Sequence, residues 1–570
     1  MSTAELRSCV TGTRTRVRAG ALHRRGLTTA GTGFTEEERD KLGIRGLIPP
    51  RFQTMEQQLA RVDHQIATKQ TPIEKHIALF NLRQRNERLF YAYLMHHMRE
   101  TLPLVYTPTV GEACQKFSQM FRRPEGLTIT IEDKGRVSKV VDNWPRPADT
   151  PRVAVITDGS RILGLGDLGW NGLGIALGKL SLYVVGAGVH PRSTLPIVVD
   201  VGTNSEHYLN DKLYLGLERR RPGTEEYIEF MDEVMEALHN KYPNLIIQYE
   251  DWSSDHAFLF LERYQNKYPM FNDDIQGTGA VILGGFINAA RTYAEASNTH
   301  AADQRILMVG SGSAAIGVAK QLMQFFIVEG MPEEEARSRI WTTDTKGLVT
   351  MDRGDKLAEH KLFFARKDNN GKQVRELEDI VDYVKPTAIF GLSTVRGTFN
   401  EGVLRRMGQY NKRPIIFPLS NPTSNSECTF EEALRFTDGR AIFAAGSPFD
   451  KVDFQGTTRF ADQGNNFYIF PGIGLVGALT KAKHITDDVI TAAAFSLANS
   501  LNEEERSEGR VYPKLERVRD ISAAIATECA KLINKHNLAR DGGHTAKMSH
   551  DELLAYVKEQ MWVPTYEHDN

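Results

Sequence analysis

Short apolar runs of strand-forming residues alternate with longer helix-forming stretches between about residues 128 and 463. Because parallel strands need long crossover connections, usually helices, this alternation predicts parallel sheets covered on both faces, the α/β class. Residues 34–127 and 487–557 instead have a helix-forming composition; one helix is expected after Thr35 and another through Pro72–Met98. The expected strands are Val153–Thr157, Leu195–Asp200, Leu245–Tyr249, Ile306–Val309, Ile340–Thr343, Ala388–Phe390, Ile415–Pro418 and Ala441–Ala444.

Charge is distributed unevenly along the chain. The 570 residues contain 70 Lys and Arg and 72 Asp and Glu, a net charge of −2. Residues 1–33 contain six Arg and one Glu and carry +5, so residues 34–570 carry −7. An Arg-rich leader with few acids and no apolar core is typical of a mitochondrial transit peptide, although a basic tail without a targeting role has the same composition. The acidic remainder lacks the clustered positive charge that a nucleic-acid-binding surface needs.

The composition also argues against a membrane protein and against a disulfide-stabilised one. The longest uncharged run, Gln463–Thr480, contains four Gly, a Pro and two Asn, whereas a spanning helix needs about 20 mostly apolar residues. The four cysteines lie far apart without a metal-binding spacing, which favours a reducing compartment. We therefore expect a protein of the mitochondrial matrix, with the cytoplasm as the alternative.

Two glycine-rich turns compete as the nucleotide-binding loop, GSGSAA at 310–315 and GLGDLG at 164–169. Each follows an expected strand, and such a turn lets backbone N–H groups and a helix N-terminus approach a pyrophosphate. We favour the first, because three more strand-like runs follow it and because the next strand ends at Asp344, an acid that can accept from ribose hydroxyls. Its expected cofactor contacts are Gly310, Gly312, Ser313, Ala314 and Ala315.

Two acid pairs point to a metal ion. Glu250-Asp251 directly follow an apolar strand, and Asp273-Asp274 lie beside a glycine turn some twenty residues later. Acids at the carboxyl ends of parallel strands point into the crevice where such folds bind ligands. Four carboxylates there repel one another unless a divalent cation neutralises them, and all-oxygen ligation suits Mg²⁺ or Mn²⁺. For either pair alone, a solvated strand end is the alternative.

Several longer motifs occur in a fixed order. They are Val105–Gly111 (VYTPTVG), Phe121–Pro124 (FRRP), Val141–Pro145 (VDNWP), Thr157–Gly169 (TDGSRILGLGDLG), Gly178–Leu180 (GKL), Phe271–Thr278 (FNDDIQGT), Leu419–Thr423 (LSNPT), Ala445–Phe449 (AGSPF) and Gln463–Asn466 (QGNN). In these motifs the chain resembles the malic enzymes over about residues 40–565. That family oxidatively decarboxylates malate to pyruvate and CO₂ with NAD or NADP and a divalent metal.

The resemblance implies catalytic and metal-binding roles. Lys179 matches the base that takes the proton from the malate C2 hydroxyl, and Tyr106 matches the acid that protonates the enol carbon. Asp273 would tune the base. A lysine acts as a base only when its pKa is depressed, which we expect from burial and a nearby cation. The implied metal ligands are Glu250, Asp251 and Asp274.

Substrate and cofactor contacts are implied as well. Arg161 would bind a malate carboxylate, while Asn421, Asn465 and Asn466 would contact substrate and nicotinamide. By itself, Asp344 favours NAD, because a carboxylate repels the 2′-phosphate of NADP. Lys346 and Lys361 follow it, however, and NADP-using relatives have a lysine at a spacing like that of Lys361. We expect NADP, with NAD as the second choice.

Other features of the family are matched less closely. The cofactor turn has Ser311 and Ser313 where the family often has Ala and Glu, although the turn glycines are kept. Arg61 and Arg85 are candidates for the arginines that bind an activating dicarboxylate in some relatives, but the acidic partner is not evident, so this regulation is left open. The family also implies a homo-oligomer, a dimer or a tetramer. The alternative activities are an NAD-preferring malic enzyme and a metal-dependent oxaloacetate decarboxylase.

Together these features predict a Rossmann-type dinucleotide-binding domain, a second α/β domain for substrate and metal, and a helical N-terminal region. The expected boundaries are 1–33 for the transit peptide, 34–127 for the helical region, 128–275 for the substrate and metal domain (completed by 464–535), 276–463 for the dinucleotide-binding domain and 536–570 for a C-terminal tail.

Overall fold

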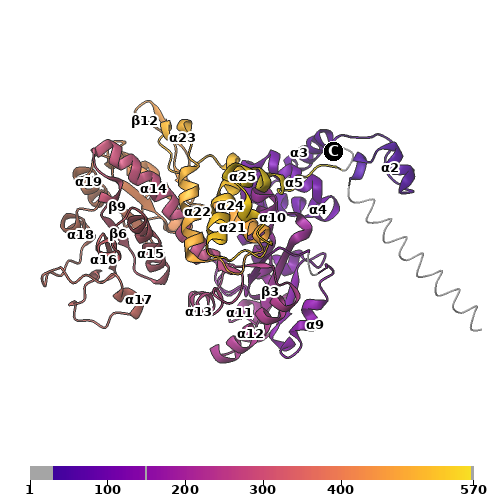
Figure 1. The fold of residues 1–570 in the computed structure, drawn as a ribbon, viewed down its shortest axis with the longest axis horizontal. Coiled ribbons are helices and arrows are strands. Elements are labelled where there is room, and N and C mark those ends of the chain that lie inside the picture. The colour runs from indigo at the N-terminus through magenta and orange to yellow at the C-terminus, as the bar shows by residue number, and fades with distance from the viewer. Residues whose placement is uncertain (1–29, 148–149, 567–570) are drawn as a thin grey trace, which may run out of the picture.

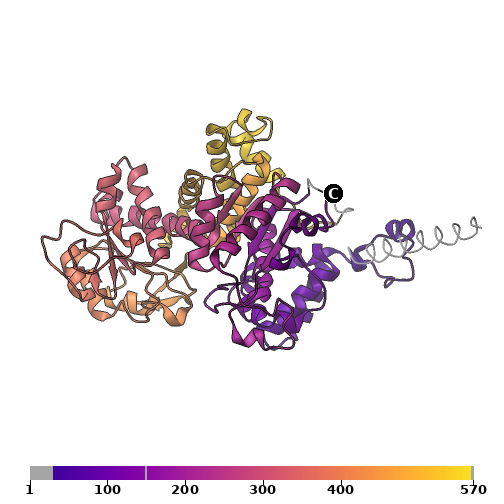
Figure 2. The same cartoon turned by 90° about the horizontal axis from the view of Figure 1, so that it is seen from below.

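The computed structural model describes residues 30–147 and 150–566. Its chain forms a helical N-terminal region and two separate sheets, with the C-terminal helices lying between the two ends of the molecule (Figures 1 and 2). The sheet that is later in the sequence occupies the left-hand end of Figure 1, and α2 projects from the opposite end. The fold is therefore mixed α/β with a helical N-terminal region, which confirms the predicted class.

The N-terminal helices begin where the sequence supplies capping residues. Capping boxes pair Thr35 with Glu38 and Thr71 with Glu74, so each helix starts with its free N–H groups satisfied. The expected continuous helix over Pro72–Met98 is wrong, because Asn86 takes a non-helical conformation and its side chain caps the next helix, accepting from the N–H of Leu89 at 3.1 Å. The helices are α2 (Glu36–Lys41), α3 (Met55–Ala67), α4 (Pro72–Arg85), α5 (Glu87–His96), α6 (Met98–Val105), α7 (Thr109–Gln115) and α8 (Phe117–Met120).

The described part of the chain includes residues 30–33, which the sequence assigns to the leader. Gly31–Gly33 form a 3-10 turn, and Ala30 and Phe34 are buried in a small apolar cluster with Ile44 and Tyr566. The N–H of Gln53 donates to the carbonyl of Thr32 at 3.0 Å, which fixes this turn to the helical region. Residues 1–29, with all six arginines of the leader, lie outside the described residues.

The first sheet is entirely parallel, in the order β1-β3-β2-β4-β5. Alternate residues of its strands enter different cores: Ala154 and Ile156 pack with α9, α12 and α13, whereas Val153 and Val155 pack with α10. Every residue of α10 is buried, including Lys179. The elements are β1 (Leu127–Thr130), α9 (Val137–Asp142), β2 (Val153–Thr157), α10 (Leu173–Ala187), β3 (Thr194–Asp200), α11 (Glu206–Leu209), α12 (Thr224–Lys241), β4 (Ile246–Tyr249), α13 (Ser254–Tyr264) and β5 (Met270–Asn272).

The second sheet has the order β14-β11-β10-β9-β6-β7-β8 and is parallel except for the pairing of β7 with β8. From β6 the chain adds strands on one side and then returns to β9 on the other, which places a topological switch point at the carboxyl ends of β6 and β9. Its strands are β6 (Ile306–Val309), β7 (Ile340–Asp344), β8 (Gly347–Leu348), β9 (Ala388–Gly391), β10 (Ile415–Pro418), β11 (Ile442–Ala445) and β14 (Asp462–Gln463). Its helices are α15 (Ser313–Val328), α16 (Glu333–Ser338), α17 (Glu359–Leu362), α18 (Leu377–Val384), α19 (Glu401–Tyr410) and α20 (Phe430–Phe436).

Helices from distant parts of the sequence join the two sheets. The helix α14 (Thr278–Ser297) packs against α15 of the second sheet and against α22, while α21 and α24 pack on α10 of the first. Among the described residues, no helix has both the length and the apolarity needed to cross a membrane. The remaining elements are the hairpin β12 (Val452–Phe454) and β13 (Thr457–Arg459), followed by α21 (Phe470–Thr480), α22 (Asp487–Asn499), α23 (Glu503–Ser507), α24 (Val518–Lys535) and α25 (His550–Glu559).

Candidate functional site

The two acid pairs meet at one edge of the first sheet. Glu250 and Asp251 directly follow β4, and Asp273 and Asp274 begin one π-helical turn directly after β5. Because β4 and β5 are neighbouring parallel strands, their carboxyl ends lie together. Carboxylate oxygens of Glu250, Asp251 and Asp274 lie within 4.8 Å of one another. The structure therefore brings together the three predicted metal ligands.

This acidic cluster has the properties of a cation site. Burial, together with the neighbouring carboxylates, raises the pKa of Glu250 and of Asp251 well above the usual values, and burial raises the pKa of Asp274 to about 6. Among the described residues, Asp251 Oδ2 and Asp273 Oδ1 are buried without a hydrogen-bond partner. Three buried carboxylates close together, one of them with an oxygen that lacks a hydrogen-bond partner, fit a hard divalent cation such as Mg²⁺ or Mn²⁺.

Lys179 lies between this cluster and Tyr106. Its Nζ atom lies 2.5 Å from Asp273 Oδ2 and 2.9 Å from Glu250 Oε1, and 5.1 Å from the centre of the Tyr106 ring. Burial opposes the charge of the ammonium group, but the two carboxylates outweigh burial and raise the pKa of Lys179 well above its usual value. The depressed pKa was expected from burial together with a cation, and the pairing of Lys179 with two acids acts in the opposite direction.

Tyr106 is placed at the end of α6 and is buried beside Lys179. Burial raises its pKa well above the usual tyrosine value, although the Lys179 ammonium acts in the opposite direction. The phenol therefore keeps its proton at neutral pH and is able to donate it.

Asp273, which binds Lys179, is also held by Asn466. The Asn466 amide donates to Asp273 Oδ2 at 3.1 Å and to the Asp273 carbonyl at 3.2 Å.

The other predicted substrate-binding residues lie at different distances from the acidic cluster in the fold. Arg161 is exposed; its N–H donates to the Asp251 carbonyl at 3.3 Å, and its guanidinium donates to the Ser254 hydroxyl. The side chain of Asn465 caps a 3-10 turn by accepting from the N–H of Phe467 at 2.9 Å. Asn421 follows β10 in the second sheet, and its amide oxygen accepts from Ser447 at 2.5 Å. The structure therefore places Arg161 and Asn466 beside the acidic cluster, whereas the described contact of Asn421 lies within the second sheet.

The Gly310 turn has the geometry of a dinucleotide-binding loop. Gly310 has φ of +120°, and a Cβ atom there would lie 2.6 Å from the Leu392 carbonyl, so no other residue fits. Gly312 is the N-cap of α15, and a Cβ atom at Gly312 would meet no other atom within 4 Å. Ser313 and Ala314 form the start of α15, and Ala315 packs inward. The open N-terminus of this helix lies next to the switch point, where such folds bind dinucleotides.

The second glycine turn has another location. Gly164–Gly169 lies between β2 and α10 and is followed by a short 3-10 turn, not directly by a helix. Its Asp167 accepts from the N–H of Gly169 at 3.0 Å and from Arg221. The turn therefore lies beside the helix that carries Lys179, far in sequence and topology from the second sheet.

Asp344, at the end of β7, is surrounded by basic residues. Arg353 donates to both of its carboxylate oxygens at 2.8 and 2.9 Å, and Lys361 donates at 2.7 Å. Burial opposes the charge, but these partners lower the pKa of Asp344 to about 2. The Lys346 ammonium binds Asp355 instead, at 2.8 Å. The cluster of three bases (Lys346, Arg353 and Lys361) and two acids (Asp344 and Asp355) therefore has a net positive charge.

Sequence reasoning missed two residues near the cofactor turn. Arg353 lies nine residues after its partner Asp344, in an irregular segment without a motif. His360 lies next to the predicted Lys361, and its Nε2 is 3.1 Å from the carbonyl oxygen of Ser311 in the glycine turn. The alternating charges from Asp352 to Asp355 are the sequence signal from which an ion-pair cluster could have been predicted.

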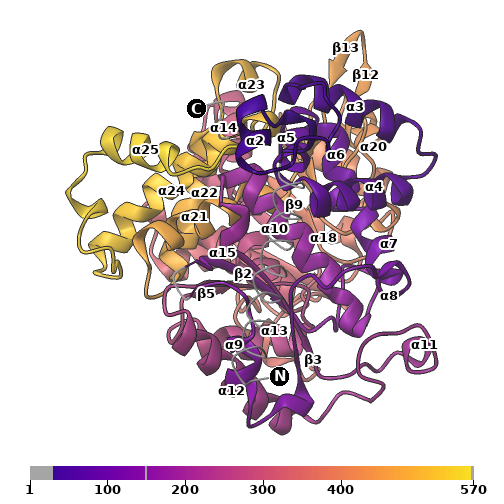
Figure 3. The same ribbon diagram turned by 90° about the vertical axis from the view of Figure 1, so that its right-hand side faces the viewer.

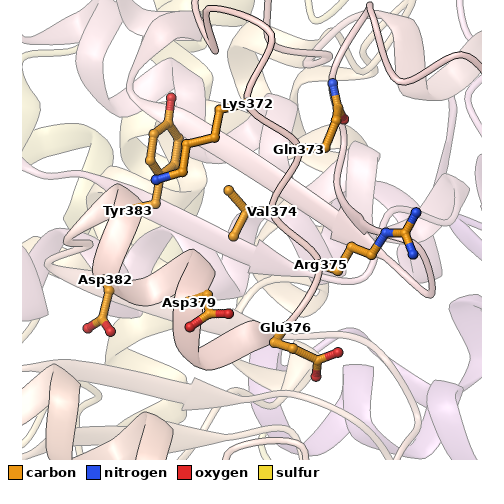
Figure 4. Close-up of a pocket in the computed structure, with 8 residues that line it drawn as sticks. All are labelled: Lys372, Gln373, Val374, Arg375, Glu376, Asp379, Asp382 and Tyr383. Carbon is orange, nitrogen blue, oxygen red and sulfur yellow. The ribbon is translucent and has the colours of Figure 1, made fainter.

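A surface pocket of about 640 Å³ lies apart from these groups. It is lined by residues 372–376 and by one side of α18, with Lys372 and Arg375 on the irregular segment and Asp379 and Asp382 on the helix (Figure 4). None of the predicted site residues lines this pocket. Its mixed charges and its distance in the fold from the acidic cluster give it no part in the site described above.

The fold and the site define a two-sheet α/β protein with a dinucleotide-type glycine turn and a buried acidic cluster suited to a divalent cation. The chain belongs to the malic enzyme family: residues 83–265 match the family's N-terminal domain, and residues 275–534 match its NAD binding domain.

Similar proteins extend over nearly the whole chain. It is 47% identical over 537 residues to the NADP-dependent malic enzyme of Dictyostelium discoideum, and the matched region covers 94% of this chain and 96% of the relative. It is 43% identical to the mitochondrial NADP-dependent malic enzyme of Mus musculus, over 94% of this chain and 87% of the relative. The crystal structure of a malic enzyme from Pyrococcus horikoshii shares the fold, with a TM-score of 0.54 at 23% identity, over 81% of this chain and 89% of the other.

Proposed function

We propose that this protein oxidises malate and decarboxylates it to pyruvate and CO₂, with transfer of a hydride to NADP. The observation that supports this proposal most directly is the arrangement around Lys179. Its ammonium lies between a buried phenol, Tyr106, and a buried acidic cluster that suits a divalent cation. A base, an acid and a cation site within contact distance are what oxidation followed by decarboxylation of a 2-hydroxy acid requires.

In the proposed reaction, Lys179 takes the C2 hydroxyl proton of malate as a neutral amine, after its ammonium proton has passed to Asp273, and the C2 hydride of malate would pass to the nicotinamide. Asp273, which shares a hydrogen bond with Lys179, is placed to take up a proton from the lysine. Loss of CO₂ then gives the enol form of pyruvate, and Tyr106 donates a proton to its terminal carbon. A divalent cation held by Glu250, Asp251 and Asp274 would lower the pKa of the C2 hydroxyl and polarise the resulting carbonyl.

Substrate binding is proposed for groups around this centre. The exposed Arg161 guanidinium suits a malate carboxylate, because arginine binds carboxylates with two parallel hydrogen bonds. Asn466 is placed to orient Asp273, and Asn421 and Asn465 are proposed to contact substrate and nicotinamide. In this view residues 128–275 and 464–535 form the substrate and metal domain, and residues 276–463 bind the dinucleotide.

The Asp344 cluster favours NADP over NAD. An isolated carboxylate at this position would repel a 2′-phosphate, but Arg353 and Lys361 neutralise it and the cluster has a net positive charge. The relatives described above are named NADP-dependent. We therefore propose NADP as the preferred cofactor and Lys361 as a ligand of its 2′-phosphate.

Localisation and assembly are also proposals. The leader composition and the mitochondrial name of one relative support import into the mitochondrial matrix, while another relative, from Arabidopsis thaliana, is named chloroplastic. We expect a homo-oligomer. A fluorescent fusion of the full chain, and sedimentation of the purified protein, test these two proposals.

The decisive experiment for the activity follows NADP reduction at 340 nm after malate and Mn²⁺ are added to the full-length protein. NADPH and pyruvate should form in equal amounts, and a chelator should abolish both. An oxaloacetate decarboxylase without the oxidative step would release CO₂ from oxaloacetate but reduce no NADP with malate, and that outcome would overturn the proposal.

A further inference from the structure

The Gly164–Gly169 turn lies outside the proposed cofactor site, and an arginine from a distant loop holds it in place. Arg221 lies between α11 and α12, which are labelled in the lower part of Figure 3. Its guanidinium donates to Asp158 Oδ2 at 3.0 Å, to the Asp158 carbonyl at 2.9 Å and to both oxygens of Asp167 at 2.9 and 3.0 Å. A single side chain therefore joins Asp158, the residue directly after β2, to Asp167 in the glycine turn.

The groups around Arg221 are shielded from water. Arg221 is 9% exposed, and Asp158 is fully buried. Tyr227 on α12 also donates to Asp158 Oδ2, at 2.6 Å. A buried carboxylate is stable only when it is paired and hydrogen-bonded, so the conformation of Asp158 depends on Arg221 and Tyr227.

From Asp158 the hydrogen bonds continue into the acidic cluster. Asp158 Oδ1 accepts from the N–H and hydroxyl of Ser160 at 2.9 and 2.6 Å, and the Ser160 hydroxyl accepts from the N–H of Ser253 at 2.7 Å. The next residue, Arg161, donates its N–H to the carbonyl of Asp251. The segment held by Arg221 thus contacts the carbonyl of one metal-ligand candidate, Asp251, and the N–H two residues after it.

Asp251 needs this support from its surroundings. It has φ of +55°, a left-handed conformation that is uncommon outside glycine and that persists only when neighbouring contacts hold it. Its carbonyl and the N–H two residues later are the atoms that bind the segment held by Arg221. If that segment moved, the backbone of Asp251 would lose its hydrogen bond from the Arg161 N–H, and Arg161 would lose its fixed position.

We propose that Arg221 is a positioning residue, which sets the geometry of Arg161 for the malate carboxylate and of Asp251 for the divalent cation without touching either ligand. The proposal rests on the proposed function for its malate part, while its cation part concerns the acidic cluster alone. Lysine keeps the charge but lacks the planar fork that reaches two carboxylates and a carbonyl at once, so Arg221→Lys isolates the geometric role.

The test compares Arg221→Lys with Arg220→Lys in the full-length protein. Arg220 is the adjacent residue, but it is exposed and pairs on the surface with Glu206. We expect Arg221→Lys to weaken Mn²⁺ binding, measured by calorimetric titration of chelator-treated protein, by about tenfold, the effect typical of groups that orient metal ligands. The KM for malate should rise by a similar factor, whereas the KM for NADP, whose turn lies in the other sheet, should not change. Arg220→Lys should match the wild type in all three.

A milder variant tests the same network in case Arg221→Lys does not fold. Tyr227→Phe removes one donor from Asp158 and leaves Arg221 in place, so it should shift the Mn²⁺ affinity in the same direction by a smaller factor. The proposal is overturned if Arg221→Lys binds Mn²⁺ and malate like Arg220→Lys, including the case in which only its melting temperature falls. Failure of the proposed function is distinguishable, because wild-type protein would then not reduce NADP with malate while the Mn²⁺ titrations still report on Arg221.

Discussion

The ammonium nitrogen of Lys179 lies 2.5 Å from Asp273 Oδ2, although 94 residues separate the two in the chain. Both side chains are buried, and the Asn466 amide donates to the same carboxylate oxygen. Such a short charge-assisted hydrogen bond in a dry environment fixes the position of both groups. It also places the proposed base next to its own proton acceptor.

Replacement of Lys179 by methionine should abolish most of the activity. General bases contribute about 10² to 10⁴ in rate, so kcat for malate oxidation should fall within that range. Lys139→Met, at an exposed lysine of α9, is the matched control and should leave kcat unchanged. The rates are measured by NADP reduction after circular dichroism has shown that both variants are folded. Retention of more than a tenth of wild-type kcat by Lys179→Met would contradict the assignment of the base.

Lys361→Ala should shift the cofactor preference toward NAD. A hydrogen bond to a charged group contributes about 1.5–3 kcal/mol, so the ratio of kcat/KM for NADP to that for NAD should fall about 10- to 100-fold. The nearby Lys356→Ala, at an exposed position of the same segment, should leave the ratio unchanged. Equal ratios in the two variants would remove Lys361 from the 2′-phosphate site.

The helical region should lose stability in mild acid through His76. Burial lowers the pKa of His76 to about 4, even though its Nδ1 atom lies 2.8 Å from the Leu104 carbonyl, whereas the unfolded chain protonates near 6.5. Because the unfolded state binds the proton more tightly, stability falls as the pH drops below 6.5, by about 2 kcal/mol between pH 7 and pH 5. The loss levels off below pH 4, where both states are protonated.

Denaturant unfolding at the two pH values measures this effect. His76→Phe keeps an aromatic ring beside Phe80, with which His76 stacks at 4.2 Å, and removes the titration. The variant should therefore show a pH-dependent loss that is smaller by about 2 kcal/mol, while His64→Phe, at an exposed position of α3, should behave like the wild type. An unchanged pH dependence in His76→Phe would show that other groups cause the acid sensitivity.

The stability contributed by the apolar cluster of Ala30, Phe34, Ile44 and Tyr566 can be tested by truncation. A chain that begins at residue 30 keeps Ala30 and Phe34 in the cluster with Tyr566 and should melt like the full-length protein. A chain that begins at residue 35 loses both, and burial of one phenylalanine alone contributes about 1.5–3 kcal/mol. Thermal unfolding of the two shortened chains, together with limited proteolysis of residues 35–54, measures the difference. Equal melting of the two would show that this cluster adds no stability.

The sequence predicted the buried parallel strands well because such strands read as continuous apolar runs. Val153–Thr157, Ile306–Val309 and Ile415–Pro418 agree with β2, β6 and β10 in both bounds, and the other expected strands agree within one residue at each end. The short strands β1, β5 and β8 were missed, because a run of two to four residues carries too little pattern. The break at Asn86 was missed for a similar reason: helix-forming residues continue on both sides of it, and only the cap geometry reveals the end of the helix.

The site was predictable where chemistry follows directly from a strand or a turn. The acids after β4 and β5 and the turn after β6 are examples. Arg353 and Arg221 were missed because they lie in irregular segments, and their partners are chosen by the tertiary fold. The upward effect of the acids on the Lys179 pKa was not anticipated, since it depends on the pairing with Asp273, which joins two elements far apart in the chain.

Asp273 and Asp274 are consecutive residues that face different partners. The first binds Lys179, and the second accepts from the N–H of Asp251 at 2.7 Å. A single peptide unit therefore joins the proton-transfer pair to the cation site and fixes the distance between the backbones of the two residues. A shift of the turn that precedes α14 would therefore displace Asp273 and Asp274 together relative to Lys179 and Glu250, so that proton transfer and cation binding are coupled through the backbone.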